Sequence, residues 1–286
     1  MIRKLKVIEI QTISNCNSHC IVCPWIKIKD SVTKLNMSEY VWSKVLEGIS
    51  MLKPEIMIPY MNNEPLLDKD IASRIHDLRS LNEKAQIEFS TNGLLLSEKS
   101  SSFLVNHADI ILISLFGSDE ISNTRLMGEG MSYQKIKQNI LNLKKAKEDS
   151  GSQSIINIVK LKNNPFLSNN IVWADSSFWE SEGIDIRYYS FVDRSGTVGD
   201  FKQRENSKIP RGCALNRHNE RTYIHSNGDV CFCCHDWRRE YLMGNLNENS
   251  LIEIVNGEQY KRIRDMVDGV AASDDNFLCR KCLFCL

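Results

Sequence analysis

Short apolar segments alternate with amphipathic segments over the first two-thirds of the chain. The apolar segments are rich in β-branched residues and predict strands at residues 5–13, 55–61, 86–90, 109–115, 154–160 and 185–192. Between them, apolar residues recur at helical spacing and predict helices at 38–52, 71–81, 97–105, 133–146 and 170–182, the last one broken by serines. This alternation predicts right-handed crossovers and a parallel sheet. We therefore expect an α/β fold, a partial (β/α)6 TIM-like barrel whose site lies at the carboxyl ends of its strands.

The pattern changes after Asp193. Residues 194–212 are polar and contain several glycines, which predicts a linker. The remaining residues, 213–286, predict a hairpin with strands at 222–225 and 229–233, followed by a helix at 251–267. The expected organisation is a barrel over 1–193, a linker over 194–212 and a small C-terminal α+β iron–sulfur module over 213–286.

Composition narrows the class of protein. Among 286 residues, 36 basic and 36 acidic side chains balance, so bulk charge favours neither nucleic acid nor an anionic membrane as a partner. No apolar run reaches the roughly 18 residues that a membrane-spanning helix needs. The amino-terminal segment runs directly into a strand and lacks the apolar core of a signal peptide. We expect a cytoplasmic protein that binds neither nucleic acid nor membrane.

Three cysteines follow the first predicted strand at C-x3-C-x2-C spacing. Cys16, Cys20 and Cys23 form a compact thiolate set, and thiolates select zinc, copper or iron–sulfur clusters. Three thiolates can hold three irons of a four-iron cluster and leave the fourth iron open to chelate a small molecule. The alternatives are a zinc site or three unrelated thiols. A structural zinc usually takes a fourth protein ligand, and only His19 is near in sequence.

The C-terminal module contains seven further cysteines: Cys213, Cys231, Cys233, Cys234, Cys279, Cys282 and Cys285. Four thiolates are enough to close a second cluster, and the three left over do not complete a third. Strand alternation predicts that Cys231 and Cys233 share one face while Cys234 lies on the other. We expect one auxiliary cluster, with a structural zinc on the same four thiolates as the alternative.

Polar residues gather where the predicted strands end. Glu64 follows the second strand, Ser90 ends the third and Asn92 follows it, and Ser114 lies at the end of the fourth. Since the carboxyl ends of parallel strands meet at one edge of a barrel, we expect these side chains to lie near the first cysteine set.

The first cysteine motif resembles that of the radical S-adenosylmethionine enzymes, in which the open iron binds the amino and carboxylate groups of that cofactor. The C-terminal module resembles the Twitch domain, the shortened form of the SPASM domain. The matching stretches run along most of the chain: 16–24, 64–67, 91–93, 193–196, 213, 228–236, 243–245 and 278–282. The resemblance implies two 4Fe-4S clusters and S-adenosylmethionine as cofactors.

The same resemblance implies roles for single residues. Cys213, Cys233, Cys279 and Cys282 would ligate the auxiliary cluster, and Cys285 has no evident counterpart. Glu64 and its neighbours would bind the amino group of the cofactor. The residues that would contact its ribose or carboxylate are Ser90, Asn92, Ser114 and Arg125. The alternatives are a solvated loop acid for Glu64 and an ordinary strand-end serine for Ser114.

Arg194 and His235 are the candidate catalytic residues. Arg194 lies in a stretch that, by the resemblance, faces the substrate. An arginine is a poor base, so hydrogen bonding to a hydroxyl is its expected role, with a surface salt bridge as the alternative. By the resemblance, the family has a glutamate at the position of His235. A neutral His235 could accept a proton near neutral pH, or it could be a solvated turn residue.

The implied function is that of a radical oxidoreductase. It would generate a 5′-deoxyadenosyl radical, abstract hydrogen from a hydroxylated cyclitol or sugar-like metabolite, and pass an electron to the auxiliary cluster. The implied partners are a small-molecule substrate and a reducing donor such as flavodoxin or ferredoxin. One alternative is a radical enzyme that crosslinks or epimerises a peptide. Another is a non-enzymatic iron–sulfur protein.

Overall fold

Six parallel strands form the first part of the molecule, as predicted. The computed structural model describes residues 4–30, 32–196, 198 and 209–286, so most of the expected linker, at 197 and 199–208, lies outside the described residues. The strands are β1 (Val7–Ile10), β2 (Ile56–Ile58), β3 (Gln86–Thr91), β4 (Ile110–Ser114), β5 (Ile155–Lys162) and β6 (Asp185–Ser190). Each strand pairs in parallel with the next, and the sheet does not close, which confirms the partial barrel.

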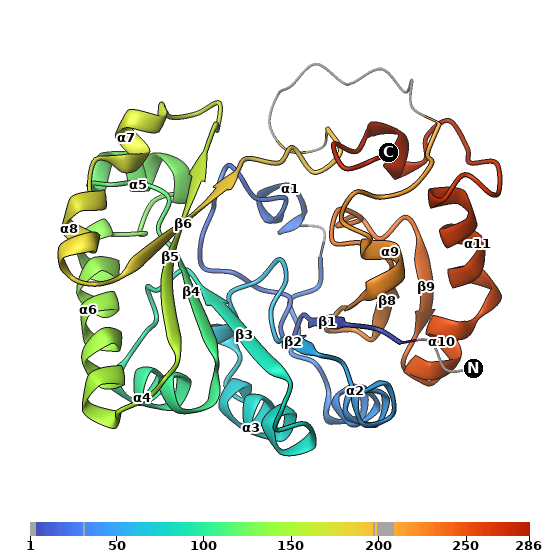
Figure 1. Ribbon diagram of the computed structural model, residues 1–286, viewed down its shortest axis with the longest axis horizontal. Helices are drawn as coiled ribbons and strands as arrows, with labels where there is room; N and C mark the ends of the chain where they lie inside the picture. Colours follow the sequence, from blue (N-terminus) through green and yellow to red (C-terminus); the bar gives the residue numbers. More distant parts are fainter. Residues whose placement is uncertain (1–3, 31, 197, 199–208) are drawn as a thin grey trace.

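Helices and short helical turns connect the strands, and the longer helices pack along the outer side of the sheet (Figure 1). They are α1 (Trp25–Ile28), α2 (Glu39–Leu52), the 3-10 turn η1 (Pro65–Leu67), α3 (Ile71–Leu81), α4 (Glu98–His107), α5 (Glu120–Met127), α6 (Tyr133–Ser150), α7 (Asn169–Trp173) and α8 (Ser176–Ser181). Local caps fix several of their starts. Ser38 accepts a hydrogen bond from Val41 N at the start of α2, and Ser97 forms a capping box with Ser100 at α4.

The C-terminal residues continue the same sheet. They contain α9 (Arg217–Glu220), β7 (Arg221–Ile224), β8 (Asp229–Cys231), β9 (Leu242–Asn245), α10 (Leu251–Asn256), α11 (Glu258–Val267) and the 3-10 turn η2 (Leu278–Lys281). Strand β7 pairs in parallel with the free side of β1, and β8 and β9 follow in antiparallel order, giving a nine-stranded sheet. In Figure 1 this places α9, α10 and α11 on the opposite side of β1 from strands β3–β6.

The helices differ from the sequence-based expectation in two places. The broken helix expected over 170–182 is two short helices, α7 and α8, but the continuous helix expected over 251–267 is interrupted at Gly257. Gly257 has an extended backbone (φ −69°, ψ 160°) that ends α10 and starts α11, and glycine is a poor helix former. Helix α5 was not predicted. It has only eight residues and depends on a capping box between Asp119 and Ser122.

The expected hairpin is present, but its second strand is shorter than predicted. Gly228 occupies the turn with φ at 90°, a left-handed conformation that suits glycine. Strand β8 ends at Cys231 after a shift of register between Val230 and Cys231. Strict alternation therefore stops there, and the prediction that Cys231 and Cys233 share a face was wrong.

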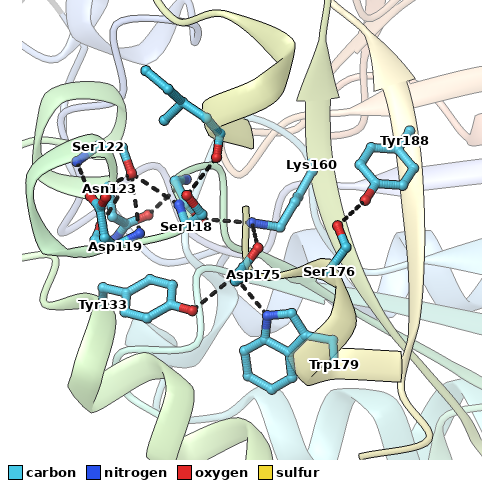
Figure 2. A network of polar contacts seen from close by, with 12 residues as sticks. Ser118, Asp119, Ser122, Asn123, Tyr133, Lys160, Asp175, Ser176, Trp179 and Tyr188 are labelled. Carbon is cyan, nitrogen blue, oxygen red and sulfur yellow. Dashed lines mark hydrogen bonds and ion pairs between the residues drawn. The ribbon is translucent and has the colours of Figure 1, made fainter. Parts of the chain in front are cut away.

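A buried ion pair fastens the outer layer to β5 (Figure 2). The Lys160 ammonium is fully buried and lies 2.8 Å from an Asp175 carboxylate oxygen. It also donates to the carbonyl oxygen of Gly117 at 2.7 Å. Asp175 accepts hydrogen bonds from the Tyr133 hydroxyl and from the Trp179 indole, each at 2.8 Å. One carboxylate thus joins β5, α6 and α8.

Within the described part of the chain, no helix combines the length and the apolar character that crossing a membrane requires.

Candidate functional site

A cavity of about 670 Å³ opens at the carboxyl ends of the barrel strands. Seven of the predicted site residues share its lining with Arg194 and His235: Cys16, Cys20, Cys23, Glu64, Ser90, Asn92 and Ser114. Aromatic and aliphatic side chains fill much of the rest, among them Tyr60, Phe116 and Phe191. A second hollow, of about 750 Å³, is lined by residues such as Lys27, Trp237 and Arg238, and none of the predicted site residues lines it.

The loop with the first three cysteines is held against the end of α5. The Ser18 hydroxyl lies 2.7 Å from the Met127 carbonyl oxygen and 2.9 Å from the Cys20 sulfur. His19 N donates to the same carbonyl at 3.0 Å. A side chain at Gly128 would meet His19, since a Cβ there would lie 2.9 Å from the His19 Cβ. This close approach of α5 orients the loop so that all three sulfur-bearing side chains line the cavity.

The three thiols suit an iron–sulfur cluster chemically. All three cysteines are free and partly buried, and thiolates are the protein ligands of four-iron clusters. Burial raises the pKa of Cys20 to about 12 and also raises the pKa values of Cys16 and Cys23. The thiols are therefore protonated at neutral pH in the absence of a positive charge, and cluster assembly would displace these protons.

The Glu64 side chain is buried and forms hydrogen bonds to the end of β3. It is 1 % exposed, so the solvated-acid alternative was wrong. Its carboxylate accepts from the Thr91 hydroxyl and Asn92 N, both at 2.8 Å, and from Leu66 N at 3.1 Å. Burial raises the pKa of Glu64 to about 7, although these hydrogen bonds lower it. The carboxylate thus ties the segment that follows β2 to the end of β3 at the cavity wall.

The structure brings three of the four predicted ribose and carboxylate contacts together. Ser90, Asn92 and Ser114 lie at the ends of β3 and β4 and line the cavity. Asn92 donates to the Asn17 side-chain oxygen at 2.7 Å, which links β3 to the cysteine loop. Arg125, in contrast, is exposed on α5 and does not line the cavity, so its role stays a prediction.

Arg194 and His235 lie on the side of the cavity nearest the C-terminal residues. Arg194 has a left-handed backbone (φ 50°), and its Nη1 lies 3.7 Å from the Cys234 sulfur. His235 is 2 % exposed, so the solvated-turn alternative was wrong. Burial, together with the charges of Arg194 and Arg217, lowers the pKa of His235 to about 4 against the opposing effect of Cys234. His235 is therefore neutral at physiological pH.

Arg217 is a site residue that sequence reasoning missed. It lines the cavity from α9 and donates to His235 Nε2 at 3.1 Å. Its guanidinium also lies over the Phe284 ring, 5.2 Å from the ring centre. The only sequence signal was its place four residues after Cys213.

A smaller cavity, of about 20 Å³, is lined by five of the C-terminal cysteines. Its lining includes the four predicted ligands and Cys285: Cys213, Cys233, Cys279, Cys282 and Cys285. Cys213 and Cys285 also pair through an antiparallel backbone bridge. Burial acts to raise the pKa of Cys213, but hydrogen bonds from His218 and from backbone N–H groups outweigh it and lower the pKa below its usual value. Cys231 lies outside this cavity, in β8.

The donor set of the small cavity fits an iron–sulfur cluster. All of its cysteines are free, and four thiolates complete the ligand set of a closed four-iron cluster. Among the described residues, no group of three or more His, Cys, Asp or Glu side chains is arranged around a single metal ion.

One family of known proteins matches the C-terminal part of the chain. Residues 213–283 match the SPASM family, described as an iron-sulfur cluster-binding domain. GTP 3',8-cyclase of Aquifex aeolicus (strain VF5) is 22% identical over 206 residues. That match covers 70% of this chain and 60% of the Aquifex protein, so the chain matches less than two-thirds of that relative's length.

Solved structures share the fold over nearly the whole chain. BtrN in complex with AdoMet and 2-DOIA has a TM-score of 0.64 and 18% identity, covering 99% of this chain and 94% of BtrN. Native anSMEcpe with bound AdoMet has a TM-score of 0.68 and 15% identity, covering 98% and 88%. SuiB of Streptococcus suis bound to the precursor peptide SuiA has a TM-score of 0.73 and 15% identity, covering 98% and 70%. In its C-terminal residues the chain matches the SPASM iron–sulfur domain, and over nearly its whole length it shares the fold of solved structures that contain S-adenosylmethionine (AdoMet).

Proposed function

We propose that the chain is a radical AdoMet oxidoreductase with two 4Fe-4S clusters. One observation carries this proposal: a single cavity is lined by the first three cysteines, by polar groups from the ends of β2–β4, and by Arg194 and His235 next to the second cysteine set. When bound, the first cluster and AdoMet supply a reductive cleavage that lets the enzyme take a hydrogen atom from a substrate carbon, and the second cluster supplies an electron acceptor.

The residues of this chain would bind the two clusters and AdoMet, orient the reacting groups and shield them from water. Cys16, Cys20 and Cys23 would hold the first cluster, and the second would be held by Cys213, Cys233, Cys279 and Cys282. Ser90, Asn92 and Ser114 offer hydrogen bonds for the ribose and carboxylate of AdoMet. Apolar side chains such as Phe116 and Phe191 exclude water from the reacting atoms.

The proposed substrate is a hydroxylated cyclitol or sugar-like metabolite. Arg194 supports this choice because its guanidinium can donate to a hydroxyl without taking its proton. The fold shared with BtrN, whose structure contains 2-DOIA, supports it as well. The peptide bound in the SuiB structure supports a second candidate, a radical enzyme that modifies peptides.

The first experiment tests the chemistry. Reconstituted and reduced protein is incubated with AdoMet, and 5′-deoxyadenosine is measured. We expect product from the wild-type protein and none above background from a Cys16/Cys20/Cys23→Ala variant. Equal amounts in both would leave a non-enzymatic iron–sulfur protein as the better account.

The second experiment tests the substrate class. Polyols or peptides deuterated at carbon are added separately, and deuterium in 5′-deoxyadenosine is measured. We expect transfer from polyols. Transfer from peptides alone would replace the first candidate with the second.

A further inference from the structure

Three residues form a wall between the two cavities. Arg217 and Phe284 line both the large cavity and the small one. His235 lines the large cavity, and its Nδ1 lies 3.6 Å from the sulfur of Cys282, which lines the small cavity. A substrate in the large cavity is therefore separated from the C-terminal cysteines by these side chains.

The hydrogen bonds of His235 define where its proton lies. Arg217 Nη1 is 3.1 Å from His235 Nε2, and a guanidinium can only donate. Nε2 must therefore accept, so it carries no hydrogen. In a neutral ring the single N–H is then on Nδ1, which points at the Cys282 sulfur.

Packing holds the ring in this orientation. The His235 backbone N–H donates to the Cys233 sulfur at 3.4 Å, and the ring lies 5.8 Å from the Phe284 ring centre. The Arg217 guanidinium also lies over the Phe284 ring, 5.2 Å from its centre. The imidazole thus has no free acceptor nitrogen with which to take a proton from a substrate.

We propose that His235 is a positioning residue that donates its Nδ1–H to the Cys282 thiolate and thereby raises the reduction potential of the second cluster. Arg217 fixes the required tautomer through Nε2. Reduction adds negative charge to the cluster and its sulfur ligands, and a donor aimed at a sulfur stabilises that charge. No proton is transferred. His235 makes the cluster a better acceptor for an electron that leaves the substrate.

The test measures the midpoint potential of the second cluster in an EPR-monitored redox titration. The Cys16/Cys20/Cys23→Ala background isolates that cluster, so neither AdoMet nor substrate is needed and the result does not depend on the proposed function. Four proteins are compared: His235 unchanged, His235→Phe, His235→Asn and His235→Gln. The two amides are a matched pair, because asparagine places an N–H near the position of Nδ1, whereas glutamine reaches the position of Nε2.

We expect a lower potential in His235→Phe and His235→Gln, and a potential near that of the unchanged protein in His235→Asn. A residue that only fills space would give no difference between the two amides. Equal potentials in all four proteins would overturn the proposal, as would a potential in His235→Asn as low as that in His235→Phe. A protein that assembles no second cluster would also overturn it.

Discussion

His225 is a second buried histidine, and it lies where β7 meets the segment that follows β1. It is 3 % exposed, and its Nδ1 is 3.2 Å from the Gln11 side-chain oxygen. Burial lowers the pKa of His225 to about 3, and Arg239 lowers it further while Asp229 opposes this. In the folded protein His225 therefore stays neutral under conditions in which an ordinary histidine takes up a proton.

Because the pKa of His225 is lower in the folded protein than in the unfolded chain, the free energy of unfolding depends on pH. Between about pH 6.5 and pH 3 the unfolded chain binds a proton at His225 that the folded protein does not bind, so the free energy of unfolding falls as pH falls. One such proton is worth at most about 1.4 kcal/mol for each pH unit. We expect His225→Gln, which can still bond Gln11, to flatten the decline in urea midpoint from pH 6.5 to pH 5. Parallel curves for the two proteins would contradict this.

At the residue scale, the sequence predicted most of the side chains that line the cavity. It did not predict the hydrogen-bond partners that hold those side chains in place. Glu64 was expected at a strand end, and it is there. Its carboxylate is held, however, by Thr91 and Asn92 at the end of the next strand along the chain. His235 depends on Arg217 in the same way. Such partners come together only through the fold, so residue type and spacing cannot reveal them.

At the scale of elements, the Lys160–Asp175 pair decides how the outer helices sit on the sheet. Both charges are buried, and Asp175 also holds Tyr133 of α6 and Trp179 of α8 (Figure 2). Burial lowers the pKa of Lys160, and the neighbouring Asp175 carboxylate raises it. The lysine therefore depends on its partner to remain charged inside the protein.

Removing one charge of the Lys160–Asp175 pair should lower the free energy of unfolding more than removing both charges. We expect Asp175→Ala to lower the free energy of unfolding by about 3–5 kcal/mol, because it leaves a buried ammonium without a counter-charge. The double variant Lys160→Met/Asp175→Leu should recover much of that loss, since it has no charge left to compensate. Urea unfolding of the three proteins measures this. A double variant as unstable as Asp175→Ala would contradict the prediction.

The elements that sequence reasoning located well are those with a strong apolar pattern. All six barrel strands and the hairpin were predicted, because buried parallel strands are nearly continuous apolar runs. The errors fall where local geometry prevails over pattern. Gly257 interrupts a helix whose apolar residues continue on both sides, and β8 ends early at a shift of register. Neither feature changes hydrophobic periodicity, so neither can be read from it.

At the scale of the whole molecule, barrel and C-terminal residues share one core. The largest cluster of buried apolar residues includes Ile8 and Val45 from the barrel as well as Val230 and Phe277 from the C-terminal part. Helices α2 and α10 approach closely because α2 has Gly48 at the contact. A Cβ at Gly48 would lie 2.7 Å from the Cβ of Leu251. The pairing of β1 with β7 was not predicted, because nothing in the sequence specifies which strand the hairpin joins.

We expect Gly48→Val to separate α2 from α10 and to lower the free energy of unfolding by about 1–3 kcal/mol, as overpacking does. Since the core is shared, far-ultraviolet circular dichroism and the absorbance of the second cluster should shift together to a lower urea midpoint. Ser43→Val is the matched control, because Ser43 lies on the exposed face of α2. Loss of the cluster absorbance well before loss of helix would contradict a shared core.

The position of β1, hydrogen-bonded to β2 on one side and to β7 on the other, limits how such a protein can be recombined. A chimera that received these C-terminal residues would need a first strand with an unoccupied edge in the same register. Conversely, a truncated version ending after β6 would expose the amide and carbonyl groups of Val7–Ile10 along that edge, where another polypeptide could add as a neighbouring strand. Self-association is therefore the expected failure of a chain that ends at that point, even though the six remaining strands are complete.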